Sequence, residues 1–315
     1  MAIMLMDVQA NMQDHLCAEV IDEFRKNSFL LDNMIFDDAV SPTGGGSTLT
    51  YAYTRVSTPA RAATRAINME YEGQEAKKQR HVVDLKVFGG AFDIDRVLAS
   101  TGGIVDEVQF QLQQKVKATQ ALFSDMVING DTLTDTYGFD GLDKALSGSD
   151  TEMETSVDLS TSALITENYM QFLDELDEMI AKLDGAPSCL LGNSAMMAKL
   201  RAVARRASMY QTDKDSWGNL VEYYGGIPLI DLGAKSGSTD PIIATLDGKT
   251  SLYAVRLGLD GFHGVTMNSQ SPIRTWLPDF ETAGTVKRGE VEMVAAVALK
   301  STRAAAVLRG VKISA

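Results

Sequence analysis

The segment from residue 51 to residue 80 cannot form a core of its own, and this limits the folds that the chain can adopt. It reads YAYTRVSTPARAATRAINMEYEGQEAKKQR, which is rich in small and charged residues and poor in large aliphatic ones. A segment that buries little apolar surface gains too little free energy to offset the entropy lost on ordering. We therefore interpret it as a projecting arm that depends on a neighbouring chain, a long hairpin with strands near residues 49–56 and 80–88. The glycines just before it, at residues 44–46, indicate a loop or hinge.

The rest of the chain has the composition of a soluble globular protein, and this excludes several classes. Of its 315 residues, 45% are hydrophobic and 23% are charged. Its longest apolar runs fall far short of the ~18–20 residues that a membrane-spanning helix needs, and the first residues lack the pattern of a secretory signal. The two cysteines, Cys17 and Cys189, fit a reducing compartment rather than a disulfide framework. We expect about two domains and no membrane contact.

Charge is distributed unevenly along the chain. The net charge of −13 argues against a protein whose main task is to grip nucleic-acid phosphates. Residues 131–184 hold fourteen acidic residues against two lysines, whereas residues 51–86 and 286–315 are basic. This asymmetry suits copies that meet acidic face to basic arm, although a set of solvated faces would give the same pattern.

Helical periodicity predicts one helix of unusual length. In residues 104–129 the apolar positions keep helical spacing, and Asn129-Gly130 supplies a C-terminal stop. Asn193 or Ser194 is suited to cap another helix. Residues 137–146 are typical of a turn followed by a short amphipathic piece. The other predicted helices lie near residues 14–31, 169–183 and 196–203.

Patterns typical of β-strands separate these helices. Residues 81–95 are β-rich but carry a break at Gly89-Gly90, and residues 147–162 and 205–218 are polar enough for an exposed linker and a loop. The last two β-prone runs, residues 291–299 and 303–313, are predicted to form a hairpin turned at Lys300-Ser301-Thr302. Shorter strands are predicted at residues 188–191, 227–231, 242–246 and 251–257.

No arrangement of residues points to enzymatic chemistry. Gly248-Lys249-Thr250 ends like a phosphate-binding loop, but Ile243 stands where that motif needs glycine, and Gly192-Asn193-Ser194 lacks the second glycine of a hydrolase motif. Two pairs lack the further partners of a zinc or acid–base site: His15 with Cys17, and Asp93 with Asp95. We predict no catalytic, cofactor-binding or metal-ligating residues, and an enzyme with an α/β core in residues 162–260 is the competing hypothesis.

Three segments and the order of the elements carry a resemblance to a known family. The segments are NGDTLTDTYGFDGLDKAL, LLGNSAMMAKLRAVARR followed by YYGGIPLID, and RGEVEMVAAVAL with TRAAAVLRGVKI. The chain resembles, over essentially its whole length, the major capsid protein of tailed bacteriophages. Its implied fold is the α+β Hong Kong 97-type capsid fold, which encapsulin shells share.

The resemblance implies a domain plan and a function. The plan has a spine helix at about residues 104–129. Its parts are an N-terminal arm (1–40), an extended loop (41–86), a peripheral domain (87–146 plus 286–315) and an axial domain (147–285). The implied function is self-assembly, through pentamers and hexamers, into an icosahedral shell around a phage genome. The alternative is an encapsulin-like shell around protein cargo. A tail-tube or decoration protein would be mainly β, which the long helix argues against.

The same resemblance implies partners, a location and contact residues. Only about 40 residues precede the arm, so we expect a separate scaffolding protein, together with a portal and weakly contacted double-stranded DNA. The expected location is the virion capsid, with assembly in the host cytoplasm, and no cofactor is expected. The residues predicted to contact acids on a neighbouring copy are Arg55, Arg61, Arg65, Lys77, Lys78 and Arg80.

Overall fold

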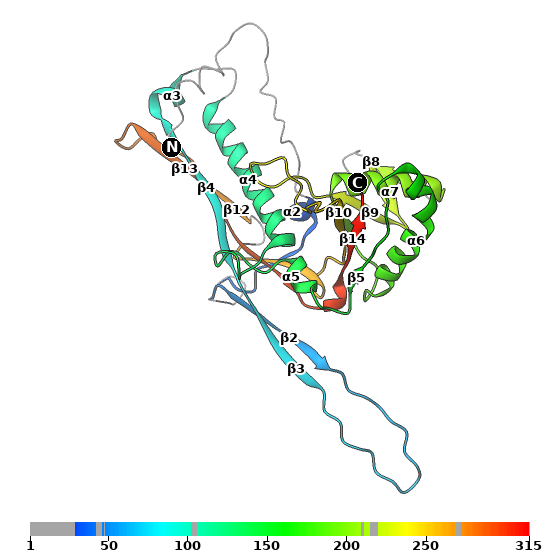
Figure 1. Ribbon diagram of the computed structural model, residues 1–315. Helices are drawn as coiled ribbons and strands as arrows, with labels where there is room; N and C mark the ends of the chain where they lie inside the picture. The colour runs from blue at the N-terminus through cyan, green and yellow to red at the C-terminus, as the bar shows by residue number, and fades with distance from the viewer. Residues whose placement is uncertain are drawn as a thin grey trace.

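Two β-sheets, a long helix and a projecting two-stranded arm make up most of the structure (Figure 1). This computed structural model describes residues 29–41, 46, 48–101, 106–208, 211–214, 220–268 and 272–314. The helix predicted at residues 14–31 lies largely outside these ranges, and α2, Phe29–Asn33, overlaps only the end of that prediction.

The first sheet is organised around one long strand, β13, Val286–Leu299. β4, Lys86–Asp95, runs antiparallel along its first ten residues. β12, Ile273–Trp276, and β11, Phe262–Thr266, pair with the middle and the end of β13, and β1, Phe36–Asp37, adds to β11.

The predicted break at Gly89-Gly90 is wrong, because β4 continues through both glycines. A Cβ at Gly89 would lie 2.0 Å from the carbonyl oxygen of Val291 on the paired strand. The glycine therefore allows a close approach of two backbones instead of ending the strand. The prediction that the arm's second strand extends to residue 88 is also wrong, because β3 ends at Asp84 and the chain then enters β4.

The predicted long helix is α4, Glu107–Asn129, and it packs on the first sheet. It begins after Asp106, whose carboxylate accepts hydrogen bonds from the Val108 and Gln109 amides, and it ends before Gly130 as expected. Its buried face includes Phe123, whose ring centroid lies 6.2 Å from that of Phe88 on β4. Burial of each large apolar side chain on this face contributes about 1.5–3 kcal/mol. A short helix, α3, Arg96–Ser100, links β4 to the residues before α4.

The second sheet has seven strands in the described residues, and two helices pack on it. The helices are α6, Ser162–Ala181, and α7, Ser194–Arg206, with the predicted cap at Asn193. In spatial order the strands are β5 (Glu152–Glu154), β14 (Ala305–Lys312), β10 (Lys249–Val255), β6 (Cys189–Gly192), β9 (Ile227–Asp231), β8 (Leu220–Tyr224) and β7 (Gln211–Lys214).

The C-terminal hairpin is a wrong prediction. β13 belongs to the first sheet and β14 to the second, where β14 pairs with β10 and β5. The segment predicted as a tight turn includes η1, Thr302–Ala304, and carries the chain from one sheet to the other. Both runs are buried through much of their length, so each has a neighbouring sheet to pair with and they do not need each other.

Three smaller predictions also need correction. Residues 242–246 form no strand in the described structure, although Ile242 and Ile243 are buried. The supposed exposed linker at 147–162 contains β5 and the buried Val157 and Leu159. The supposed loop at 205–218 contains the end of α7 and β7.

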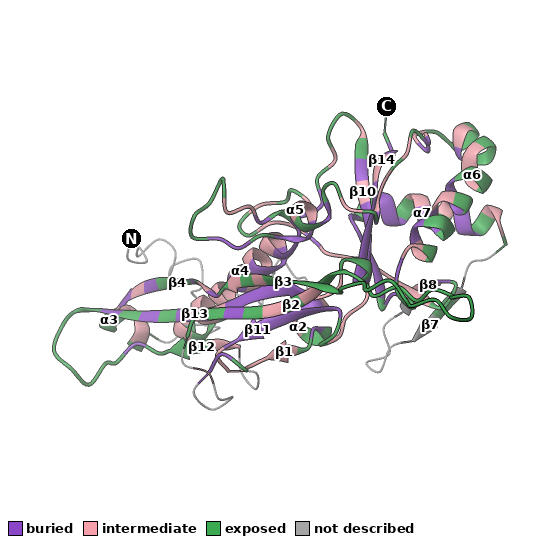
Figure 2. Ribbon diagram, turned by 90° about the horizontal axis from the view of Figure 1, so that it is seen from below, coloured by how far each residue is buried: buried purple, intermediate pink, exposed green. Residues whose placement is uncertain are grey.

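The predicted arm is confirmed as a hairpin. Its strands, β2, Thr50–Thr58, and β3, Lys77–Asp84, pair antiparallel from Thr50 opposite Asp84 to Thr58 opposite Lys77. They lead into an extended loop of residues 59–76 that stands away from both sheets (Figure 1). Every residue from 59 to 80 is exposed, as the green colour of the arm shows (Figure 2).

Candidate functional site: the projecting arm

The outer part of the arm presents basic side chains to solvent. Arg61, Lys77, Lys78 and Arg80 are exposed, and none of them forms an ion pair or a side-chain hydrogen bond within the part of the chain that the structure describes. Because their charges are uncompensated, these four are available to carboxylates outside the chain. The structure places the other two predicted contact residues, Arg55 and Arg65, in different surroundings.

Arg55 is bound at the root of the arm by its own chain. Its Nε donates to the carbonyl of Lys300 at 2.9 Å, and its Nη2 donates to the carbonyl of Leu299. Tyr53 Oη donates to the same Leu299 carbonyl at 3.0 Å, and the Arg55 guanidinium lies 5.6 Å from the Tyr53 ring centroid. These bonds fasten β2 to the end of β13, so we name Tyr53 and Arg55 the root clamp.

A buried polar cluster lies beside the root clamp. Tyr51 Oη donates to Asp37 Oδ2 at 2.8 Å, and its ring makes an edge contact with the His263 ring at 5.8 Å. Burial, with the nearby Lys300 cation, lowers the pKa of His263 to about 4. Burial and the Asp37 carboxylate raise the pKa of Tyr51 above its ordinary value. His263 is therefore neutral at pH 7 and packs as an uncharged ring at the base of the arm.

The tip of the arm is a formed turn. The Met69 amide donates to the Ala66 carbonyl at 3.2 Å, and Asn68 takes the left-handed conformation at φ 69°, which Asn tolerates. Arg65 Nη1 donates to the Met69 carbonyl at 3.0 Å, and its guanidinium lies 5.3 Å from the Tyr71 ring centroid. The turn displays Ile67, which is 89% exposed. Arg65 therefore braces the tip instead of pointing freely outward.

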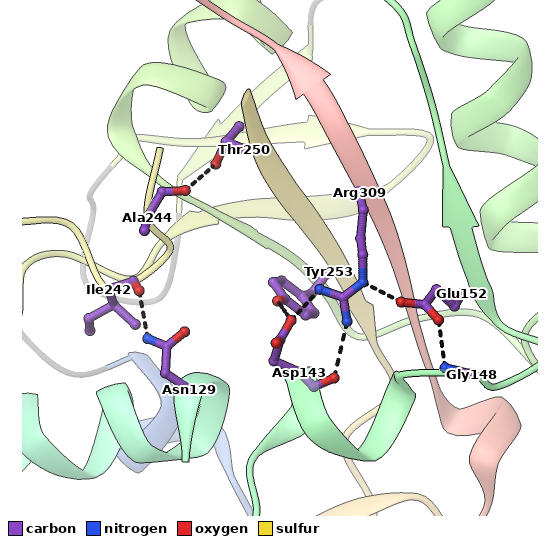
Figure 3. Close-up of polar contacts among 9 residues, drawn as sticks. All are labelled: Asn129, Asp143, Gly148, Glu152, Ile242, Ala244, Thr250, Tyr253 and Arg309. Atoms are coloured by element: carbon purple, nitrogen blue, oxygen red, sulfur yellow. Dashed lines mark hydrogen bonds and ion pairs between the residues drawn. The ribbon is translucent and has the colours of Figure 1, made fainter. Parts of the chain in front are cut away.

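A charged network that the sequence did not reveal links α5, Leu142–Leu146, to the second sheet (Figure 3). Arg309 on β14 donates through Nη1 to Asp143 and through Nε to Glu152 on β5, and its Nη2 donates to the Asp143 carbonyl at 3.1 Å. Tyr253 Oη on β10 donates to Asp143 at 2.7 Å. The partners stand more than 100 residues apart in the chain, so no local pattern could have paired them.

Asp93, Asp95 and Cys189 have structural roles and do not form a reactive site. Asp93 pairs with Arg288 at 2.9 Å, and that guanidinium lowers the pKa of the carboxyl. Asp95 caps α3 by accepting from the Val97 amide. Cys189 is buried, and burial raises the pKa of its thiol to about 12, so it is not a reactive thiolate. His15 and Cys17 lie outside the described residues.

The described residues contain neither a cluster of metal ligands nor a membrane-spanning helix. Within those ranges, no three His, Cys, Asp or Glu side chains gather as they would around a metal ion. Likewise, none of the helices in those ranges is both long and apolar enough to cross a bilayer.

Solved structures resemble this one over almost its whole length. No family model matches the sequence, and no curated protein matches it significantly. The holo-SrpI encapsulin complex from Synechococcus elongatus PCC 7942 aligns over 99% of this chain and 97% of its own, with a TM-score of 0.63 and 15% identity. The capsid of Myoviridae phage XM1 aligns over 98% and 99%, with a TM-score of 0.61 and 11% identity.

A third structure, the capsid of the native GTA particle, aligns over 95% of each chain with a TM-score of 0.62 and 12% identity. At identities this low the likeness concerns the arrangement of the backbone. It extends over almost the whole of each chain. The protein has the α+β fold of Hong Kong 97-type capsid and encapsulin shell proteins.

Proposed function

We propose that the chain is a major capsid protein that self-assembles through pentamers and hexamers into an icosahedral shell enclosing a phage genome. The observation that carries the proposal is the arm. Residues 59–80 are all exposed and cannot be stabilised by a core of their own. Ordering such a segment costs conformational entropy, and contacts with a neighbouring copy are the simplest compensation.

The proposal keeps the basic arm residues as contacts between copies. Arg61, Lys77, Lys78 and Arg80 carry free positive charge, and the chain as a whole is acidic. Each exposed ion pair is worth about 1 kcal/mol or less, so a shell depends on the repetition of many weak contacts. Arg55 and Arg65 support the same surface indirectly, by holding the root and the tip of the arm.

The proposal also keeps the domain plan of the sequence analysis. Residues 1–40 would be the N-terminal arm, 41–86 the extended loop, 87–146 with 286–315 the peripheral domain, and 147–285 the axial domain, with α4 as the spine. In such a plan the two domains exchange strands, since β11 and β12 pair with β13 while β14 pairs with β10. Because strands of one domain pair with strands of the other, the two domains would not move independently.

The partners and the location belong to the proposal as well. A separate scaffolding protein and a portal would direct assembly in the host cytoplasm, and the finished shell would be the virion capsid. The net charge of −13 favours only weak contact with packaged double-stranded DNA. The proposed role is structural, not catalytic.

An encapsulin-like shell is the second candidate, because one of the similar structures is an encapsulin that aligns over 99% of this chain. The two candidates differ in the contents of the shell. Nucleic acid in shells from infected or induced host cells would support the capsid, and a single co-purifying protein would support the encapsulin-like shell.

An arm deletion tests the proposal. Thr58 and Lys77 are paired across the hairpin, so residues 59–76 can be replaced by an Asn-Gly turn without changing the register. We expect the wild-type chain to form particles of sub-megadalton mass or larger by light scattering. The deletion variant should keep its thermal midpoint but remain small. Equal assembly by both chains would contradict the role given to the arm.

A further inference from the structure

We infer that His263 is an acid-sensitive latch for the root of the arm, because protonation of its buried ring releases β2 from the first sheet and lets the hairpin pivot as one body. The inference concerns contacts within a single chain, so it does not depend on the proposed shell. It gives a conformational role to a titratable group that the proposed function does not use.

The His263 ring is enclosed and only partly hydrogen-bonded. The residue lies on β11 and is 0% exposed, and its Nε2 lies 3.4 Å from Tyr51 Oη. Burial and Asp37 raise the pKa of Tyr51, which stays protonated and donates its proton to Asp37. The Tyr51 oxygen is therefore an acceptor toward the ring, so Nε2 carries the proton of the neutral imidazole. Nδ1 then holds the lone pair, and it has no hydrogen-bond partner among the described residues.

The root of the arm covers this ring. Tyr51 on β2 is 7% exposed, and its ring makes an edge contact with the imidazole at 5.8 Å between centroids. The same strand carries the root clamp, whose bonds to the Leu299 and Lys300 carbonyls hold β2 in place. A lift of β2 at this point removes the cover and lets water reach the imidazole. Because a charged imidazole is costly to bury, the opened root is the form that accepts a proton.

Charged groups from several neighbouring segments face the ring. Burial is the largest influence and opposes protonation, as does Lys300, which follows β13. Asp37 on β1, Asp260 before β11 and the Gly261 carbonyl favour the cation. Asp260 is already paired with the guanidinium of Arg256 at 2.9 Å. Burial and Lys300 outweigh the rest, and the pKa of the ring is lowered to about 4 in the closed form.

The hairpin is able to move without coming apart. β2 and β3 stay paired from Thr50 opposite Asp84 outward. The second histidine of the arm, His81 on β3, stacks on Tyr53 with the ring centroids 5.5 Å apart. Both of these rings belong to the hairpin, so their contact persists when the root lifts. Opening at the root therefore changes the surroundings of His263 far more than those of His81.

The size of the response follows from the two protonation equilibria. The pKa of the ring is about 4 in the closed root and returns to 6.5 when the root opens to water. The closed root is therefore fully favoured above about pH 7, and this preference is lost as the pH falls from 6.5 toward 4. The opened population should rise about twenty-fold between pH 7 and pH 5, and by roughly 300-fold at most.

Spin-label distances on the unassembled full chain test the latch. Labels are attached through Gln79→Cys on β3 and Gln113→Cys on α4, both exposed positions, with Cys17→Ser to leave no other accessible thiol. Pulsed electron resonance is recorded at pH 7 and pH 5, in this chain and with Arg55→Ala added to raise the opened population. We expect a second, broader set of distances that grows from pH 7 to pH 5.

Two matched variants assign the response to one ring. His263→Gln keeps a neutral polar side chain and should abolish the change between pH 7 and pH 5, whereas His81→Gln should leave it intact. Identical distances at both pH values in the Arg55→Ala chain would overturn the inference. A response that persists in His263→Gln would also overturn it, since another group, such as Asp37, would then be the source.

Circular dichroism separates local release from unfolding. The helical signal should be the same at pH 7 and pH 5 in every variant, and its loss together with the change in distances would contradict a local latch. Assembly is scored separately. Shells from a chain whose arm ignores pH would leave the proposed function standing without the latch, and a responsive arm on a chain that never assembles would leave the latch standing without the proposed function.

Discussion

Removal of the Arg55 side chain should loosen the arm at its root without unfolding the protein. The guanidinium makes charged hydrogen bonds to the Leu299 and Lys300 carbonyls at the end of β13. Hydrogen bonds to charged groups are worth about 1.5–3 kcal/mol each when buried, and Arg55 is half-buried. Arg55→Ala should therefore lower the free energy of local opening by about 2 kcal/mol, an increase of roughly thirty-fold in the opened population.

Amide hydrogen exchange on the unassembled subunit measures this opening. Peptides that cover β2 and β3 should exchange about thirty-fold faster in Arg55→Ala, while peptides from α4 and the second sheet stay unchanged. Arg61→Ala is the matched control, because that arginine lies on the same arm and forms no side-chain bond among the described residues. Equal exchange of the arm in the two variants would refute the root clamp.

Three further predictions concern stability. Arg309→Met leaves two carboxylates without their partner and should lower the free energy of unfolding by about 1–3 kcal/mol, visible as a fall of several degrees in the thermal midpoint. Gly289→Ala should lower the free energy of unfolding by about 1–3 kcal/mol, because the new Cβ would lie 2.4 Å from the Phe92 ring. Gly73 lies in open space on the arm, so Gly73→Ala should lower it by less than about 0.5 kcal/mol. Denaturant titration measures both values, and equal losses would contradict the packing argument. Because the pKa of His263 is lowered from 6.5 in the unfolded chain to about 4 in the folded one, its contribution is complete above about pH 7 and is lost as the pH falls from 6.5 toward 4. His263→Gln should flatten that part of the stability profile, and an unchanged slope would show that His263 is not its source.

Local signals predicted the arm and the long helix well. The arm contains few large aliphatic residues, which can be read directly from the sequence, and residues 59–80 are all exposed in the structure. The helix was predicted from helical spacing of apolar residues and a stop at Gly130, both of which are read from neighbouring positions, whereas its N-cap at Asp106 was not anticipated. Predictions of this kind hold because the deciding interactions lie within a few residues.

Pairing between distant segments could not be predicted in the same way. β13 and β14 are two β-prone runs separated by a short polar stretch, which is the local signature of a hairpin. In the structure β13 pairs with β4 and β14 pairs with β10, and both partners lie far away in sequence. Each pairing buries the strand within a different sheet. The Gly89-Gly90 break failed for the same reason, since the partner strand at Val291 requires the glycine there.

The candidate site shows both cases. Exposed Arg61, Lys77, Lys78 and Arg80 remain predicted contacts, and the family resemblance together with the charge of the arm pointed to them. Composition could not distinguish Arg55 and Arg65, whose partners are backbone carbonyls. Every residue has a backbone carbonyl, so the sequence does not show which carbonyl accepts a hydrogen bond from an arginine. A count of charges therefore treats every arginine on the arm as free to bind another chain.

Electron cryomicroscopy of particles assembled from the purified chain tests the central claim most directly. The account predicts closed shells of pentamers and hexamers in which the arm of each subunit lies across a neighbouring copy. The contradictory result is a chain that stays a compact monomer at all concentrations, with or without co-expressed partners, and whose residues 59–76 are protected from proteolysis by contacts within the same chain.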